Sequence, residues 1–90
     1  GCVMWMTRWD AAQHGYLEIV QRKVTGADID LRDHNGWTVL HAACLGGHTR
    51  VVRWVLLQGA GVNLRDNHGH TPLWFAAWGG HIDCVIRLLG

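Results

Sequence analysis

Short apolar stripes separated by glycines dominate the pattern of this chain. Within 51–56, apolar residues stand at i, i+1, i+4 and i+5, and Arg50 and Arg53 fall on the other side. This spacing is that of a helix with one buried side. The stripe therefore predicts a helix that starts near Thr49 and is ended by Gly59, because glycine is unfavourable inside a helix and common just after it.

A second kind of helix is predicted just before this one, over about 39–45. Thr38 stands at its start, where a hydroxyl can cap the first backbone N–H groups, and Gly46-Gly47 stops it. In the later segment Thr71-Pro72, proline occupies the first helical position, where its missing N–H costs nothing. The pattern thus predicts two short helices joined by a glycine turn.

The same pattern returns after 33 residues. The segment 33–43 recurs as 66–76 with Asp, Gly, Thr, Leu and Ala in register, and Gly46-Gly47-His48 recurs as Gly79-Gly80-His81. Asn35-Gly36 has the chemistry of a tight hairpin turn with positive φ. A fixed period of this length indicates a solenoid, in which each unit buries its apolar side against its neighbours.

The motif Asp-x-x-Gly-x-Thr-Pro-Leu-x-x-Ala-Ala-x-x-Gly-His resembles the ankyrin repeat. The segment 66–81 matches it almost fully, and 33–48 matches it with Val39 in place of proline. The resemblance implies an all-α, ankyrin-type solenoid of about three helix-turn-helix units joined by hairpin-like loops. We expect a single domain over 1–90, with repeats at about 1–32, 33–65 and 66–90, the last one truncated.

The first and third units depart from this pattern. The first lacks the Asp-x-x-Gly turn and one residue of its second helix, so that Lys23 falls on an apolar position. In the third, the buried stripe of the second helix has two possible phases. One uses positions 84, 85, 88 and 89, the other positions 82, 85, 86 and 89, and the sequence does not decide between them.

Composition narrows the class of protein. The chain has 90 residues, is 49% hydrophobic and carries a formal net charge of +1, so we expect neither a nucleic-acid nor a membrane partner. No basic leader precedes an apolar run, and the longest uncharged apolar stretch is 73–78. The three cysteines are odd in number and far apart, which favours reduced thiols in an intracellular protein, cytoplasmic or nuclear.

We expect no catalytic, metal or cofactor site. The sequence contains no nucleophile elbow, zinc-protease motif or phosphate-binding loop. Of its seven histidines, His48 and His81 recur at the repeat period, which places them on successive units instead of around one ion. The resemblance implies that His41, His48 and His81 form structural hydrogen bonds. His68 and His70 are a local pair, but nothing beside them completes four zinc ligands.

The resemblance implies that the chain is a non-catalytic module that binds a partner protein through its concave surface. That surface is lined by the hairpin position before Thr and by the last positions of the inner helix. Tryptophan is enriched at interface hot spots, although Trp37 and Trp78 could instead pack against neighbouring units. Of the other tryptophans, Trp54 should be buried, and Trp9 and Trp74 structural. The candidate partner-binding residues are Trp5, Gln13, His14, His34, Asn35, Trp37, Leu45, His68, His70 and Trp78.

Two alternatives stay open beside this hypothesis: a structural spacer within a longer array, and an engineered ankyrin binder. Both ends of the chain are apolar, at 3–6 and at 88–89, which makes end-to-end self-association a further expectation. Arg32 and Arg65 recur at the repeat period. They could form salt links between successive loops, which we favour, or face an acidic partner.

Overall fold

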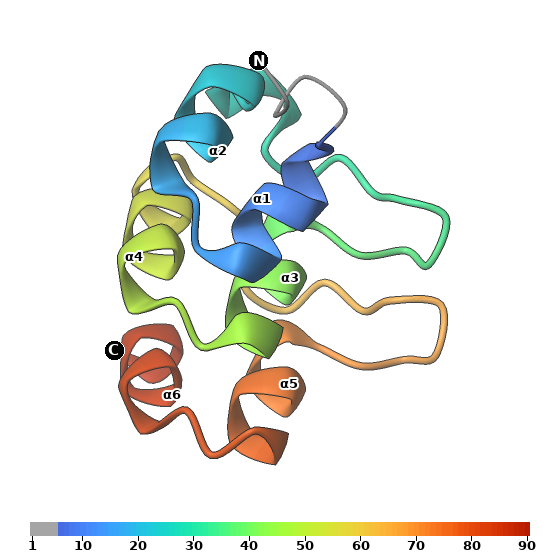
Figure 1. Ribbon diagram of the computed structural model, residues 1–90. Coiled ribbons are helices and arrows are strands. Elements are labelled where there is room, and N and C mark those ends of the chain that lie inside the picture. Colours follow the sequence, from blue (N-terminus) through green and yellow to red (C-terminus); the bar gives the residue numbers. More distant parts are fainter. Residues whose placement is uncertain (1–5) are drawn as a thin grey trace.

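The computed structural model describes residues 6–90, and within this range the chain folds into three helix pairs (Figure 1). The inner helices α1, α3 and α5 form one layer, and the outer helices α2, α4 and α6 form a second layer. Two long loops project away from the helices on the same side. The helices are α1 (Arg8–His14), α2 (Leu17–Lys23), α3 (Val39–Gly46), α4 (Thr49–Leu57), α5 (Pro72–Trp78) and α6 (Ile82–Leu89), with a 3-10 turn η2 at Gly26–Asp28.

Each inner helix starts at a threonine cap. The hydroxyl of Thr38 accepts a hydrogen bond from the N–H of His41, and that of Thr71 accepts one from the N–H of Trp74, with Pro72 at the first turn. Both predicted helix starts are confirmed. Thr7 caps α1 in the same way, so the first unit keeps the cap although its sequence lacks the preceding turn.

The core lies between the two helix layers and is richest around α3. Ala42, Ala43 and Cys44 are fully buried, because small side chains let adjacent inner helices approach closely. The valines of the predicted stripe on α4 are also buried, which confirms that helix and its phase. Cys44 and Cys84 are buried free thiols, and burial raises the pKa of both.

The projecting loops owe their shape to an aspartate and a glycine. Oδ1 of Asp33 accepts hydrogen bonds from the N–H groups of Asn35 and Trp37, both 2.9 Å long. Gly36 then takes φ +78°, a left-handed conformation that suits glycine. The expected turn is confirmed, but within 6–90 no residue other than glycine has positive φ. Asn35 therefore does not share the left-handed conformation.

Arg32 joins successive loops, but not by the expected salt link. Its guanidinium donates to the carbonyl of Gly36, 3.2 Å away, and to the carbonyl of Arg65 in the next loop. Among the described residues it forms no ion pair with a carboxylate. The salt-link hypothesis is thus wrong for Arg32, because backbone carbonyls satisfy the side chain.

The structure decides the phase of α6. Cys84 is fully buried and Leu88 packs against the core, whereas Ile82, Ile86 and Leu89 are exposed. The phase that starts at Cys84 is therefore correct, except that it also expected Leu89 to be buried. Of the helices in residues 6–90, none is long and apolar enough to cross a membrane.

Candidate functional site: the concave surface

A groove of about 470 Å³ lies between α1 and the loop 33–37. It brings together four of the residues predicted to bind a partner: Gln13, His34, Asn35 and Trp37. Residues that the sequence analysis did not select complete the groove, and these are Thr7, Trp9, Asp10, Arg32 and Asp33. A partner would therefore meet aromatic, amide and charged side chains within one hollow.

Trp37 both lines this groove and supports the fold. Its indole Nε1 donates to Oδ2 of Asp66, 3.0 Å away, and its ring meets Phe75 edge to face at 5.3 Å. The side chain is half-buried as a result. The exposed part of the ring is available to a partner, while its contacts with Asp66 and Phe75 stabilise the packing of successive units.

Asp66 is the hydrogen-bond centre of the second loop. Its Oδ1 accepts from the N–H groups of His68 and His70, both at 2.9 Å. Burial pushes the pKa of Asp66 upward, but these amides and the Trp37 indole outweigh it and hold the pKa below its usual value. The carboxylate is thus a fixed structural charge that orders the loop.

An aromatic ladder runs from this loop along α5. We use this name for His70, Trp74 and Trp78. The rings of His70 and Trp74 stack at 3.8 Å and 5°, and those of Trp74 and Trp78 at 6.0 Å and 8°. Trp78 is 71% exposed. The ladder presents a flat apolar surface next to the loop, which is the kind of area that interface anchors supply.

The remaining candidates differ in what they offer. Gln13, His14 and His68 are exposed, and the ring of His14 stacks on Tyr16 at 5.7 Å. The side chain of Leu45 instead packs against the core. Trp5 lies outside the described residues.

Three predictions about tryptophans meet the structure differently. Trp9 is structural, as expected, since its Nε1 donates to the carbonyl of Leu31 at 3.3 Å. Trp74 is 42% exposed, because none of the helices in residues 6–90 covers it. Trp54, expected to be buried, is only half-buried and lines a hollow between α2 and α4. The repeat period of 33 residues predicts the position of each tryptophan within its unit. It does not predict which neighbouring helices cover that position.

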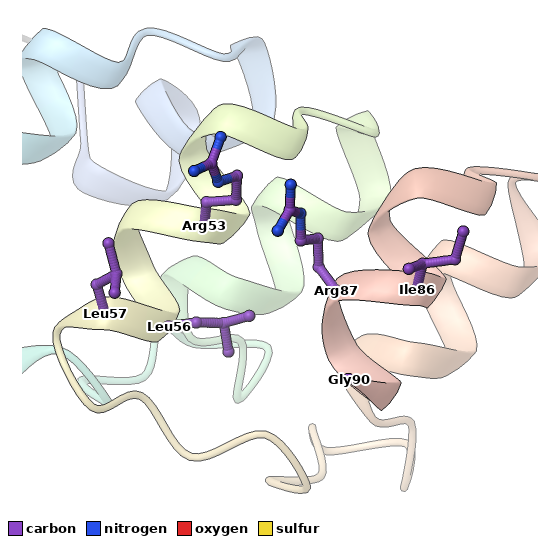
Figure 2. Close-up of a pocket in the computed structure, with 6 residues that line it drawn as sticks. All are labelled: Arg53, Leu56, Leu57, Ile86, Arg87 and Gly90. Carbon is purple, nitrogen blue, oxygen red and sulfur yellow. The ribbon is translucent and has the colours of Figure 1, made fainter.

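On the opposite side, the outer helices form a second hollow of about 420 Å³ (Figure 2). Arg53, Leu56 and Leu57 of α4 line it, together with Ile86, Arg87 and Gly90 from the α6 end. It contains aliphatic and basic side chains without a nucleophile or an acid–base pair. This hollow offers no arrangement for catalysis.

His41 is the most enclosed histidine. Its Nδ1 accepts from the N–H of Thr38 at 3.1 Å, so Nε2 carries the proton and donates to the carbonyl of His70 at 3.0 Å. Burial lowers the pKa of His41. Its role is structural, as predicted, and so is that of His81, whose ring bonds the carbonyl of Leu45. Among residues 6–90, no three His, Cys, Asp or Glu side chains gather where a metal could bind.

Comparison with known proteins decides the family. The family model for ankyrin repeats, in three copies, matches residues 9–90. The chain belongs to the ankyrin-repeat family. The ankyrin fold explains the threonine caps, the glycine turns and the projecting loops described above. Ankyrin repeats are generally modules of protein–protein interaction.

Curated ankyrin relatives match about half of the chain. A human transient receptor potential cation channel (subfamily A member 1) is 41% identical over 46 residues, which cover 51% of this chain and 4% of the channel. Mouse protein phosphatase 1 regulatory subunit 27 is 44% identical over 48 residues, covering 52% and 31%. The human Notch-regulated ankyrin repeat-containing protein is 44% identical over 43 residues, covering 47% and 38%. The matched region is thus a small part of each relative.

Proposed function

We propose that this chain is a non-catalytic module that binds a partner protein through its concave surface. The observation that carries the proposal is that Trp37 lines the polar groove beside α1 and its ring also contacts Phe75, which in turn contacts the His70 and Trp74 rings of the aromatic ladder. Aromatic rings would supply most of the buried area, and His34 and Asn35 would supply hydrogen bonds that orient the partner. The buried free thiols of Cys44 and Cys84 support an intracellular location.

The exposed tryptophan at the end of the ladder gives the sharpest test. Trp78→Ala removes a ring that is 71% exposed, so it should leave the fold intact and weaken a partner about tenfold or more. Gln13→Ala and His34→Ala in the groove should weaken the same partner by smaller factors. Trp37→Ala is unsuitable as the main test, because it also removes the hydrogen bond to Asp66.

Leu57→Ala serves as the matched control, since Leu57 is 80% exposed on the outer side of the molecule. The immobilised protein and each variant are used to capture proteins from a cell extract, and the retained proteins are quantified by mass spectrometry. We expect a protein that the wild type and Leu57→Ala retain equally and that Trp78→Ala loses. If every retained protein survives Trp78→Ala, or if Leu57→Ala loses the same proteins, the concave surface is not the binding site.

A further inference from the structure

Four side chains of α4 share a helix face directed away from the buried valines. They stand at i, i+3, i+4 and i+7, and they are Arg50, Arg53, Trp54 and Leu57. We call them the outer stripe. Both arginines and the leucine are exposed, and the tryptophan is half-buried. The helix is therefore apolar toward the core and presents a second face, basic and partly apolar, to solvent.

The outer stripe lies in the middle of the molecule. α4 belongs to the second helix pair, and α2 and α6 pack against it from the two neighbouring pairs (Figure 1). A further repeat at either end of the stack would contact the first or the third pair, because the units of a solenoid contact only their neighbours. The outer side of α4 is thus accessible in an array of any length.

Two hollows lie on either side of the outer stripe. One, of about 210 Å³, lies between α2 and α4 and is lined by Leu17, Arg50, Arg53, Trp54 and Leu57. The other is the hollow of about 420 Å³ beside α6 (Figure 2), and Arg53 and Leu57 line both. Leu57 is 80% exposed, more than any other large hydrophobic residue in 6–90. A partner could cover this leucine and place apolar side chains in the hollow on each side of it.

The basic side chains of the protein gather on the same side. The outer helices contain five of the eight lysines and arginines but two of the seven acidic residues, which gives them a formal charge of +3 and the rest of the chain −2. The net charge of +1 therefore conceals a separation of charge between the outer helices and the remainder. This separation favours an acidic partner on the outer side. The charged residues of the outer helices are Arg22, Lys23, Arg50, Arg53 and Arg87 against Glu18 and Asp83.

The arginines of the outer stripe have no acidic partner within residues 6–90. The ion pairs in this range involve other residues, so Arg50, Arg53 and Arg87 are all unpaired. Glu18 and Asp83 occupy the position of Arg50 on the adjacent helices, and they too form no ion pair. An arginine presents a planar fork of N–H donors that fits a carboxylate. The outer stripe thus offers donors for carboxylates that the described chain does not supply.

We propose that the outer stripe binds an acidic segment of a partner protein, at a site separate from the concave surface. Carboxylates of this segment pair with Arg50 and Arg53, and its apolar side chains cover Leu57 and the exposed part of Trp54. Arginine clusters beside apolar hollows recognise acidic motifs in this way. Because the outer helices and the loop 33–37 lie on opposite sides of the molecule, both sites can be occupied together.

An acidic segment fits this surface better than an anionic membrane does. A helix that binds a membrane surface buries its whole apolar face among the lipids, but the valine face of α4 is buried in the core. Leu57 and part of Trp54 are what α4 leaves for a bilayer. Glu18 and Asp83, in the first turns of α2 and α6, would also repel anionic lipid.

Selection from a library of random peptides displayed on phage tests the chemistry of the partner. Peptides are selected on the immobilised wild type and then sorted by their binding to Arg53→Glu, which should fold because Arg53 is exposed and glutamate favours helix. Arg65→Glu is the matched control, since Arg65 is exposed in a loop and its replacement changes the net charge equally. We expect a class of peptides that bind the wild type and Arg65→Glu but not Arg53→Glu. This class should be rich in aspartate, glutamate and apolar residues.

Fluorescence anisotropy with labelled synthetic peptides of this class gives the size of each effect. Arg53→Glu should weaken their binding about tenfold or more, and Leu57→Ala about threefold or more. Trp78→Ala should still bind them, which separates this site from the concave surface. Raising NaCl from about 50 mM to about 500 mM should weaken binding, because salt screens exposed charges. Circular dichroism checks the folding of each variant, and Arg53→Gln replaces Arg53→Glu if that variant fails to fold.

Three outcomes would overturn the proposal. If no selected peptide depends on Arg53, the outer stripe is not a peptide site. Vesicles of phosphatidylserine and phosphatidylcholine that bind the wild type but not Arg53→Glu would then assign the surface to membranes. Peptides that depend on Arg53 without an excess of acidic residues would contradict the argument from charge. An equal loss of binding in Arg65→Glu would show that the overall charge of the protein, and not the outer stripe, attracts the peptides.

Discussion

We call the side of a helix pair that points away from the preceding pair its downstream face. The downstream faces of the second and third helix pairs occupy the same positions of the repeat, yet their side chains have opposite surroundings. His41 and Cys44 are fully buried, whereas their counterparts Trp74 and Ala77 are exposed. The backbones of the two pairs are similar, since each inner helix begins at a threonine cap and ends near a glycine turn. The difference arises from coverage: α5 and α6 cover the second pair, and no described element covers the third.

This comparison separates structural residues from those available to a partner. A side chain in a covered position packs against the next pair, whereas a side chain at the same position on an open face is accessible to a partner. On the inner helices, Leu45 packs against the core while its counterpart Trp78 is exposed at the end of the aromatic ladder. We therefore propose that the third pair contributes much of the binding surface.

The largest predicted effect concerns the pair His41 and Trp74. His41→Ala removes a buried ring and leaves the N–H of Thr38 and the carbonyl of His70 without partners, so it should lower the free energy of unfolding by about 2–4 kcal/mol. Trp74→Ala removes a partly exposed ring that stacks on its neighbours and should cost about 1 kcal/mol. Urea unfolding of both variants measures the difference, and equal losses would contradict the assigned coverage.

The second prediction is a dependence on pH that comes from His41. Because burial lowers its pKa in the folded state, the unfolded state binds more protons between the folded pKa and the ordinary value of about 6.5. The contribution of His41 to stability is therefore complete above about pH 6.5 and declines as the pH falls below that value.

Protonation would also place a second N–H at Nδ1, against the N–H of Thr38. The test compares the free energy of unfolding with pH for the wild type and for His41→Gln. We expect the decrease below pH 6.5 to be smaller in the variant. Identical slopes in the two proteins would mean that His41 does not titrate as the structure implies.

The smallest predicted effect concerns the helix starts at Thr38 and Thr71. Pro72 follows Thr71 at the first turn of α5, whereas Val39 follows Thr38 at the first turn of α3. Thr38 has an extended backbone, with ψ 171°, which is compatible with a following proline. Val39→Pro should raise the free energy of unfolding by a few tenths to about 1 kcal/mol, because proline restricts the unfolded chain. A lower melting temperature would show that losing the valine side chain costs more stability than the proline adds.

The sequence contained most of this fold because its signals are local. The threonine caps, the glycine stops and the valine stripe on α4 each depend on neighbours a few residues away, and the structure confirms all of them. The turn at Asp33 was also predicted, although the positive φ belongs to Gly36 alone. Repetition at a fixed offset then implied the stacking.

Much less of the candidate site followed from the sequence, since a binding surface depends on what lies across from each residue. The exposure of Trp74 and the partial exposure of Trp54 depend on whether another helix covers them. Arg32 bonds carbonyl groups of two loops, which no side-chain pattern reveals. Asp10 lines the groove because α1 places it opposite the loop 33–37.

The most direct test of this account compares Gly47→Ala with Gly80→Ala at concentrations where the protein is monomeric. Both glycines have φ +72°, so both substitutions carry the same cost of about 1 kcal/mol for a left-handed alanine. A methyl group on Gly47 would overlap the ring of His81, whereas one on Gly80 would meet no atom within 4 Å. We predict that Gly47→Ala lowers the free energy of unfolding by at least about 1 kcal/mol more than Gly80→Ala does. Equal losses would contradict the claim that coverage by the next helix pair distinguishes the two faces.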